Sequence, residues 1–233
     1  MDWRRFACAS CVGLLLATLS GLGIRNRALA ADGASADKNA GAPLLENGDF
    51  ETGPSGEASR GKLPIGWERP FATAETLEIV PETRPGSTGR QCLKIAGDEK
   101  RPMGGAYSRL AALDPKAGLY VEGWVKPGRP EQGLRGLYFG VGWYDKDRKP
   151  VILRPNTSVN YVYLNKNEKQ GDWYRLHIAF APASDQGSGY AIPPAAAFFD
   201  VRVFTLNYPA SVWFDDIVAR SVDGKEIGRA SCR

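Results

Sequence analysis

The chain has 233 residues, with 30 basic and 26 acidic side chains, one histidine and four cysteines. Four arginines and one aspartate fall within the first 30 residues, and two arginines within the last seven, so residues 31–226 hold 24 basic and 25 acidic side chains. This net charge of −1 gives no support for binding to nucleic acid or to an anionic membrane surface. The single histidine argues against a catalytic triad and against a histidine-based metal site.

The N-terminus has the pattern of a secretory signal peptide over residues 1–30. Arg4 and Arg5 form the basic start, residues 7–23 are apolar, and residues 28–30 (Ala-Leu-Ala) form a small-x-small cleavage site. The apolar stretch is short and poorly flanked for a stable membrane span, although a transmembrane anchor is the alternative. We therefore expect a mature protein that is secreted or held in the cell envelope, outside the membrane once the signal is cleaved.

Residues 31–42 are rich in Ala, Gly, Asp and Lys, and we expect a disordered leader. From there to residue 222 the chain shows no convincing amphipathic helix, and residues 43–222 are expected to form one domain. Short strand-like runs, separated by Gly, Pro, Asp and Asn, predict about ten strands in a β-sandwich or jelly roll. These runs are residues 44–51, 67–71, 77–80, 91–96, 105–110, 119–126, 134–145, 158–164, 173–180, 197–206 and 211–219.

The alternation of apolar and polar residues predicts which side chains face the core of that sandwich. Expected to face inward are Leu119, Val121, Val125, Leu137, Phe139, Val141, Trp143, Leu176, Ile178, Phe180, Phe199, Val201 and Val203. Facing outward are Tyr120, Glu122, Trp124, Lys126, Tyr138, Tyr144, Arg175, His177, Asp200 and Arg202. Gly140 and Gly142 stand between the two tyrosines and leave space for something to approach the backbone.

The C-terminal residues 227–233 match one translated frame of a common sequencing adapter, so we expect read-through here and further domains missing downstream. Cys232 lies in this tail, and Cys8 and Cys11 lie in the signal peptide. Only Cys92 remains, so no internal disulfide is expected. Cys92 is predicted to be a partly buried small residue, the alternative being a reactive thiol.

The order of segments resembles the galactose-binding-like jelly roll of carbohydrate-binding modules of families 4, 9 and 22. The segments that carry the resemblance are Asn47–Glu51, Gly66-Trp67, Gly89–Ile95, Tyr120–Lys126, Trp173–Pro182 and Trp213–Ile217. It covers nearly the whole domain. The segment Asp147–Gly171 and the loop before Ala195 are longer than usual in that group, which bears on ligand specificity more than on the fold.

The resemblance implies a structural calcium ion between the first and last strands. It carries the ligand role onto Glu51 and onto Asp216 or Asp215, with help from backbone carbonyls of residues 47–49. Calcium takes six to eight oxygen ligands, so carboxylates and carbonyls are suitable donors. The alternative is that the two aspartates form a solvated strand end and that Glu51 pairs with a nearby Lys or Arg.

The same resemblance implies a polysaccharide or oligosaccharide partner. Sugar rings stack on aromatic side chains, and their hydroxyl groups need polar partners around the edge. The outward set offers both kinds: Trp124, Tyr138 and Tyr144 for stacking, and Glu122, Arg175, His177, Asp200 and Arg202 for hydrogen bonds. The alternative is an ordinary solvated face with aromatic residues at its rim.

We therefore predict a secreted, non-catalytic carbohydrate-binding module with a structural calcium. A structural or adhesive jelly roll without sugar affinity is the first alternative, and a polysaccharide lyase or hydrolase is the second. Glycoside hydrolysis needs two carboxylates across a cleft, and Glu122 with Asp200, expected on one face, is the nearest candidate pair. No motif marks either residue as catalytic.

Overall fold

The computed structural model describes residues 42–71, 74–97, 103–130, 136–155, 157–162, 168–185 and 190–223. The predicted signal peptide (1–30), all but the last residue of the predicted leader (31–42) and the predicted read-through (227–233) lie outside these residues. Within the described part of the chain, no helix has the length and apolar character needed to cross a membrane.

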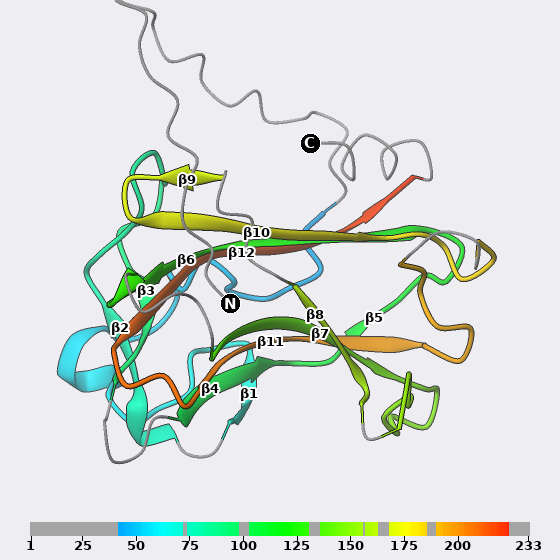
Figure 1. The fold of residues 1–233 in the computed structure, drawn as a ribbon, viewed down its shortest axis with the longest axis horizontal. Coiled ribbons are helices and arrows are strands. Elements are labelled where there is room, and N and C mark those ends of the chain that lie inside the picture. The colour runs from blue at the N-terminus through cyan, green and yellow to red at the C-terminus, as the bar shows by residue number, and fades with distance from the viewer. Residues whose placement is uncertain are drawn as a thin grey trace, which may run out of the picture. The chain divides into compact units, whose positions relative to one another are not determined.

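The domain is an all-β sandwich of the jelly-roll kind, built from two antiparallel sheets that face each other (Figure 1). Sheet A has the strand order β1 (Trp67–Pro70), β4 (Met103–Ser108), β11 (Phe198–Leu206), β7 (Leu137–Tyr144) and β8 (Val159–Val162), with β5 (Ala111–Ala112) also paired to β11. Sheet B has the order β2 (Leu77–Val80), β3 (Cys92–Ile95), β12 (Val212–Val222), β6 (Gly118–Pro127), β10 (Trp173–Phe180) and β9 (Lys169–Gln170). Two 3₁₀ turns, Gly56–Ser59 and Ala74–Thr76, precede β1 and β2. The all-β prediction is confirmed; the two-residue strands β5 and β9 are too short to leave a sequence pattern.

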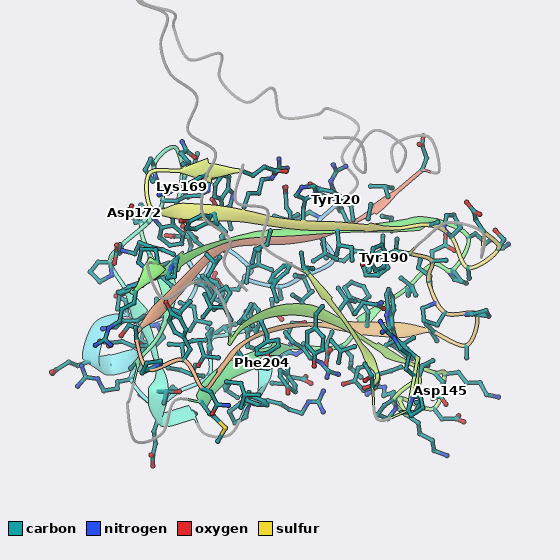
Figure 2. The ribbon with its side chains drawn as sticks, viewed as in Figure 1. Tyr120, Asp145, Lys169, Asp172, Tyr190 and Phe204 are labelled. Atoms are coloured by element: carbon teal, nitrogen blue, oxygen red, sulfur yellow. The ribbon has the colours of Figure 1, made fainter. Side chains whose placement is uncertain are left out.

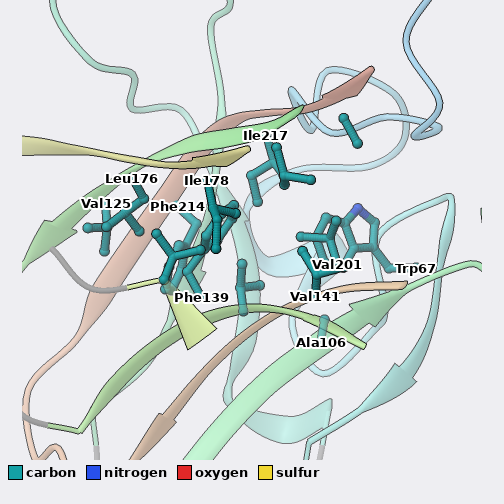
Figure 3. Packing of buried hydrophobic residues seen from close by; sticks show 14 of the residues in the cluster. Trp67, Ala106, Val125, Phe139, Val141, Leu176, Ile178, Val201, Phe214 and Ile217 are labelled. Carbon is teal, nitrogen blue, oxygen red and sulfur yellow. The ribbon is translucent and has the colours of Figure 1, made fainter. Parts of the chain in front are cut away.

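The core lies between the sheets and is built from alternate residues of the central strands (Figure 3). Twelve of the thirteen residues predicted to face inward are buried, and Leu137 is partly buried against them. Trp143 is fully buried, and its indole Nε1 donates a hydrogen bond of 2.7 Å to Asn160 Oδ1. A large indole in the centre of a sandwich needs such a partner for its N–H group.

The first and last segments of the domain lie side by side, as predicted. The backbone N–H of Leu44 donates to the carbonyl of Ala219 (2.8 Å), and that of Ile217 donates to Gly48 (2.9 Å). The prediction of a regular strand over residues 44–51 is wrong, however. Asn47 (φ 51°) and Phe50 (φ 58°) adopt left-handed backbone conformations that interrupt extended structure.

The Asn47 side chain fixes this irregular segment. Its amide nitrogen donates to the carbonyls of Thr52 (3.1 Å) and Ile65 (3.0 Å), while its oxygen accepts from the Thr52 N–H group (2.8 Å). Asparagine tolerates the left-handed region better than most residues and bonds locally to the backbone. The turn lets Phe50 reach the core, where it stacks on Trp67 with 5.3 Å between ring centroids.

Cys92 is fully buried in β3, and burial raises the pKa of its thiol well above the ordinary value, with Asp215 and Glu51 adding to the shift. An inert structural cysteine, more deeply buried than predicted, fits these surroundings.

Candidate ligand-binding face of sheet A

The residues predicted to bind sugar do not share one face. Tyr138, Tyr144, Asp200 and Arg202 lie on the outer face of sheet A, on β7 and β11. Glu122, Trp124, Arg175 and His177 lie on the outer face of sheet B, on β6 and β10. The core separates the two groups, as Tyr120 on sheet B and Phe204 on sheet A illustrate in Figure 2.

On sheet A, four side chains from three strands form a hydrogen-bonded group that we call the polar cluster: Arg69, Tyr144, Asp200 and Arg202. Asp200 Oδ2 accepts from Arg69 Nη2 (2.8 Å) and from the Tyr144 hydroxyl (2.7 Å), and Asp200 Oδ1 accepts from Arg202 Nε (2.7 Å). The Tyr144 hydroxyl in turn accepts from Arg69 Nη2 (2.5 Å) and Arg202 Nη2 (2.9 Å). With one donated and two accepted bonds, this hydroxyl uses its full capacity.

Burial differs sharply within the polar cluster. Asp200 is fully buried and Tyr144 is 4% exposed, whereas the side chain of Arg69 is 52% exposed. Burial first, and then the neighbouring Asp200 carboxylate, raise the pKa of the Tyr144 hydroxyl, so it stays protonated. Tyr144 and Asp200, both predicted to contact sugar, are therefore buried partners within the protein, and Arg69 is the member that meets solvent.

Gly142 in β7 leaves the space that the side chains of Asp200 and Arg202 occupy. A Cβ atom added there would lie 2.2 Å from Arg202 Nη2 and 2.3 Å from Asp200 Oδ1. Both distances are far below van der Waals contact, so any side chain would displace the ion pair. The space left by this glycine is thus filled by the guanidinium group of Arg202.

Beside the polar cluster lies a group of rings, the aromatic cluster, formed by Phe71, Tyr107, Tyr138, Tyr161 and Phe204. Phe204 is its centre, with ring centroids 4.4 Å from Phe71 and 4.7 Å from Tyr138, the latter nearly parallel at 10°. The Tyr161 ring lies 5.4 Å from that of Tyr138. Phe204 is 5% exposed, and the other four rings are partly exposed at its border.

Tyr107 joins the two clusters. The guanidinium groups of Arg202 and Arg69 lie over its ring at 4.7 and 5.2 Å from the centroid. Such cation–π contacts hold charged and aromatic groups in fixed relative positions. The outer face of sheet A therefore combines partly exposed rings with an adjacent set of fixed hydrogen-bond donors.

Sequence alternation identified four of the nine residues in the polar and aromatic clusters. Arg69, Phe71, Tyr107, Tyr161 and Phe204 were not among the predicted site residues. Phe204 follows Arg202 at the strand period of two, so the same alternation rule could have found it. Arg69 belongs to an edge strand whose register shifts between Trp67 and Arg69, and no local pattern signals its contact with Asp200.

On sheet B, three of the predicted sugar-binding residues belong to a network of polar contacts. Arg175 Nη2 donates to Glu122 Oε2 (2.5 Å) and to the Tyr120 hydroxyl (3.0 Å). His177 Nε2 lies 2.9 Å from Glu168 Oε1. Glu122 and Asp200 are thus on opposite outer faces, and the expectation that they share a face, as a hydrolytic pair would need, is wrong.

Trp124, the fourth predicted residue on sheet B, is covered by an arginine. The guanidinium group of Arg84 lies 4.6 Å from the ring centroid, while Arg84 Nε donates to Asp216 Oδ2 at 2.7 Å. The indole is partly buried and already stacked on a cation. A sugar ring would have to displace Arg84 from that side of the indole.

The three residues predicted to bind calcium all contact the segment of residues 83–91. Glu51 Oε1 accepts from the backbone N–H groups of Arg90 (2.5 Å) and Gln91 (2.8 Å). Asp216 Oδ1 accepts from Ser87 Oγ at 3.3 Å, and Asp215 Oδ2 accepts from Thr83 Oγ1 at 3.1 Å. The predicted set is therefore gathered in one region, between the opening segment and β12.

These carboxylates do not, as arranged, offer a free set of oxygen ligands. Protein donors occupy Glu51 and both aspartates, and Arg84 supplies positive charge beside Asp216. Among the described residues, no group of three or more His, Cys, Asp or Glu side chains is placed to hold a metal ion. Burial, followed by the Asp216 charge, raises the pKa of Asp215 to about 6. The calcium site stays a prediction, and Arg84 bonds one of the carboxylate oxygens that the ion would use.

Comparison with solved structures supports the fold. The enzymatically active domain of bacteriophage CBA120 tailspike protein 4 superposes with a TM-score of 0.51 at 8% identity, over 77% of this chain and 21% of that one. The chain thus spans about a fifth of the tailspike domain's length. A family 16 carbohydrate-binding module (TM-score 0.45, 18% identity, 76% and 98% covered) is also similar. The CBM22-1 xylan-binding domain of Paenibacillus barcinonensis Xyn10C is similar as well, with a TM-score of 0.43 and 16% identity over 79% of this chain and 97% of that one.

At these identities the likeness concerns the fold alone. No protein-family model matches the sequence. A search of curated proteins also gave no match.

Proposed function

We propose that residues 42–223 form a non-catalytic carbohydrate-binding module that binds a polysaccharide on the outer face of sheet A. The observation that supports this most directly is the contact between the aromatic cluster and the polar cluster through Tyr107. The partly exposed ring of Tyr138 offers apolar surface to a sugar ring, and the guanidinium group of Arg69, held over the Tyr107 ring, offers donors to its hydroxyl groups. The predicted signal peptide would deliver such a module out of the cytoplasm.

Sheet A is a better candidate than sheet B because its exposed groups are less fully engaged. On sheet B, Trp124 is covered by Arg84, and Arg175 already bonds Glu122 and Tyr120. On sheet A the buried members hold Arg69 in place, while its own side chain is half exposed. A surface that is ordered before binding loses less conformational entropy when a ligand arrives.

The absence of catalysis is part of the proposal. Retaining and inverting glycosidases both need two carboxyl groups within roughly 5–10 Å of each other. In the two clusters of sheet A the single carboxylate is Asp200, which is fully buried and bound by two arginines. A structural or adhesive domain without sugar affinity is the competing function, since Tyr144 and Asp200 are satisfied by protein partners alone.

Affinity electrophoresis tests the proposal with a panel of soluble polymers: xylan, β-glucan and polygalacturonate. We expect retardation by at least one polymer, and we expect Tyr138→Ala to abolish it. Trp124→Ala is the matched control, because it removes a ring of the opposite sheet and should leave retardation unchanged. No retardation by any polymer would favour the adhesive alternative, and release of reducing ends or unsaturated products would show an enzyme.

A further inference from the structure

We propose that the sheet A face selects acidic polysaccharides and that Arg69 binds the carboxylate of a uronic acid residue. This inference rests on the proposed function and adds the chemical class of the ligand. It starts from an imbalance of charge: the two clusters contain two guanidinium groups but a single carboxylate, Asp200.

The two arginines differ in how much of their hydrogen-bonding capacity the protein already uses. Arg202 is 11% exposed and bonds Asp200 Oδ1 and the Tyr144 hydroxyl, so its charge is compensated within the protein. Arg69 uses a single nitrogen, Nη2, for both of its bonds to Asp200 and Tyr144. Its Nε and Nη1 atoms bond no other described residue, and its side chain is 52% exposed.

Arg69 is also fixed in direction, which an ordinary surface arginine is not. Two hydrogen bonds and the cation–π contacts with Tyr107 (5.2 Å) and Tyr144 (5.8 Å) hold the guanidinium group in place. The remaining Nε and Nη1 donors are charged, and charge-assisted hydrogen bonds to a carboxylate are stronger than hydrogen bonds to a neutral hydroxyl group. A carboxylate on a sugar bound beside Tyr107 would therefore meet a donor that the protein already holds in place.

A second arginine adds positive charge near the end of β7. The guanidinium group of Arg148, an exposed residue, lies 5.5 Å from the ring centroid of Phe198, which pairs with Tyr144 in the sheet. The net charge of residues 31–226 is −1, so attraction of an acidic polymer would not come from the protein as a whole. It would come from this face.

The test compares polygalacturonate with the same polymer after chemical reduction of its carboxyl groups, with dextran sulfate as a third polymer. The full-length protein is used at physiological ionic strength in affinity electrophoresis. We expect polygalacturonate to bind at least about tenfold more tightly than the reduced polymer, since charge-assisted hydrogen bonds to a carboxylate are lost on reduction. Arg69→Gln should remove that difference, whereas Arg109→Gln, a 58% exposed arginine outside both clusters, should keep it.

Each outcome separates this inference from the proposed function. Equal binding of both galacturonan forms would overturn the selection of acidic sugars while leaving sugar binding intact. Dextran sulfate binding as tightly as polygalacturonate, or an undiminished preference in Arg69→Gln, would show general ion exchange and would also overturn it. Failure to bind any polymer, including xylan and β-glucan, would remove the proposed function itself. The comparison of polymers uses the unaltered protein, so it holds even if Arg69→Gln folds poorly.

Discussion

Replacing Asp200 by alanine should destabilise the domain severely, because it removes the common partner of two arginines. Asp200 is fully buried and accepts three hydrogen bonds of 2.7–2.8 Å, two of them from the guanidinium groups of Arg69 and Arg202. Breaking a buried ion pair by removing one member costs about 3–5 kcal/mol. Domains of this kind have roughly 5–15 kcal/mol of stability in total.

The measurement is equilibrium unfolding in urea, followed by tryptophan fluorescence, with thermal unfolding beside it. We expect the free energy of unfolding to fall by about 3–5 kcal/mol in Asp200→Ala with an unchanged dependence on urea concentration. The melting temperature should fall by roughly 6 to 20 °C for a domain of this size.

Glu122→Ala provides the matched control, since Glu122 is the carboxylate of the corresponding ion pair on sheet B. Its side chain is 25% exposed and that of its partner Arg175 is 37% exposed. Solvent screens such a pair, so we expect a loss of about 1 kcal/mol or less. Equal effects of the two substitutions, or a loss below about 1 kcal/mol in Asp200→Ala, would refute the assignment of Asp200 as the buried anchor of the sheet A face.

Three further predictions concern the same face and the region around Asp215. Gly142→Ala should cost about 1–3 kcal/mol in thermal unfolding, because its Cβ would displace the Arg202 guanidinium group; wild-type stability would contradict that packing. Burial raises the pKa of Asp215 to about 6 in the folded protein, above the unfolded value. The folded state therefore binds more protons than the unfolded state between about pH 4 and 6. Wild-type stability is lost as the pH rises through that window. The stability of Asp215→Asn relative to wild type should therefore increase from pH 4 to pH 7, by up to about 2–3 kcal/mol, and a flat difference in urea titrations would refute the shift. If the predicted site exists, calcium added after chelation should raise the melting temperature measured by calorimetry. The rise should be larger in Arg84→Gln, where Asp216 is released from its ion pair. No change in either protein would remove the calcium prediction.

The sequence was a good guide to which side chains enter the core. In β7 the period-two pattern correctly placed Phe139, Val141 and Trp143 inward and Tyr138 and Tyr144 outward. This works because burial of apolar area dominates the choice of face in a half-buried strand. Apart from residues 44–51, where no strand forms, the predicted strand limits were correct within a few residues.

Which outward residues belong together could not be predicted in this way. Alternation separates inside from outside for one strand, but a sandwich has two outer faces, and strand pairing decides between them. Asp200 and Glu122 look equivalent along the sequence, yet β11 belongs to sheet A and β6 to sheet B. Arg69 escaped prediction because its role depends on contacts with residues 75 and 131 positions further along the chain.

Local sequence patterns also could not predict the contacts around the expected calcium site. The resemblance correctly brought Glu51, Asp215 and Asp216 to one region beside residues 83–91. It could not indicate that Arg84 would bridge Asp216 and the Trp124 ring, because that contact joins β12 to a loop 132 residues earlier.

Amide chemical-shift mapping by NMR with a bound oligosaccharide tests the central claim most directly. With the sugar that retards the protein in gels, the account predicts that the largest shifts fall on β4, β7 and β11, around Tyr107, Tyr138 and Arg202. Shifts concentrated on β6 and β10 of sheet B, around Trp124 and Arg175, with sheet A unchanged, would contradict it.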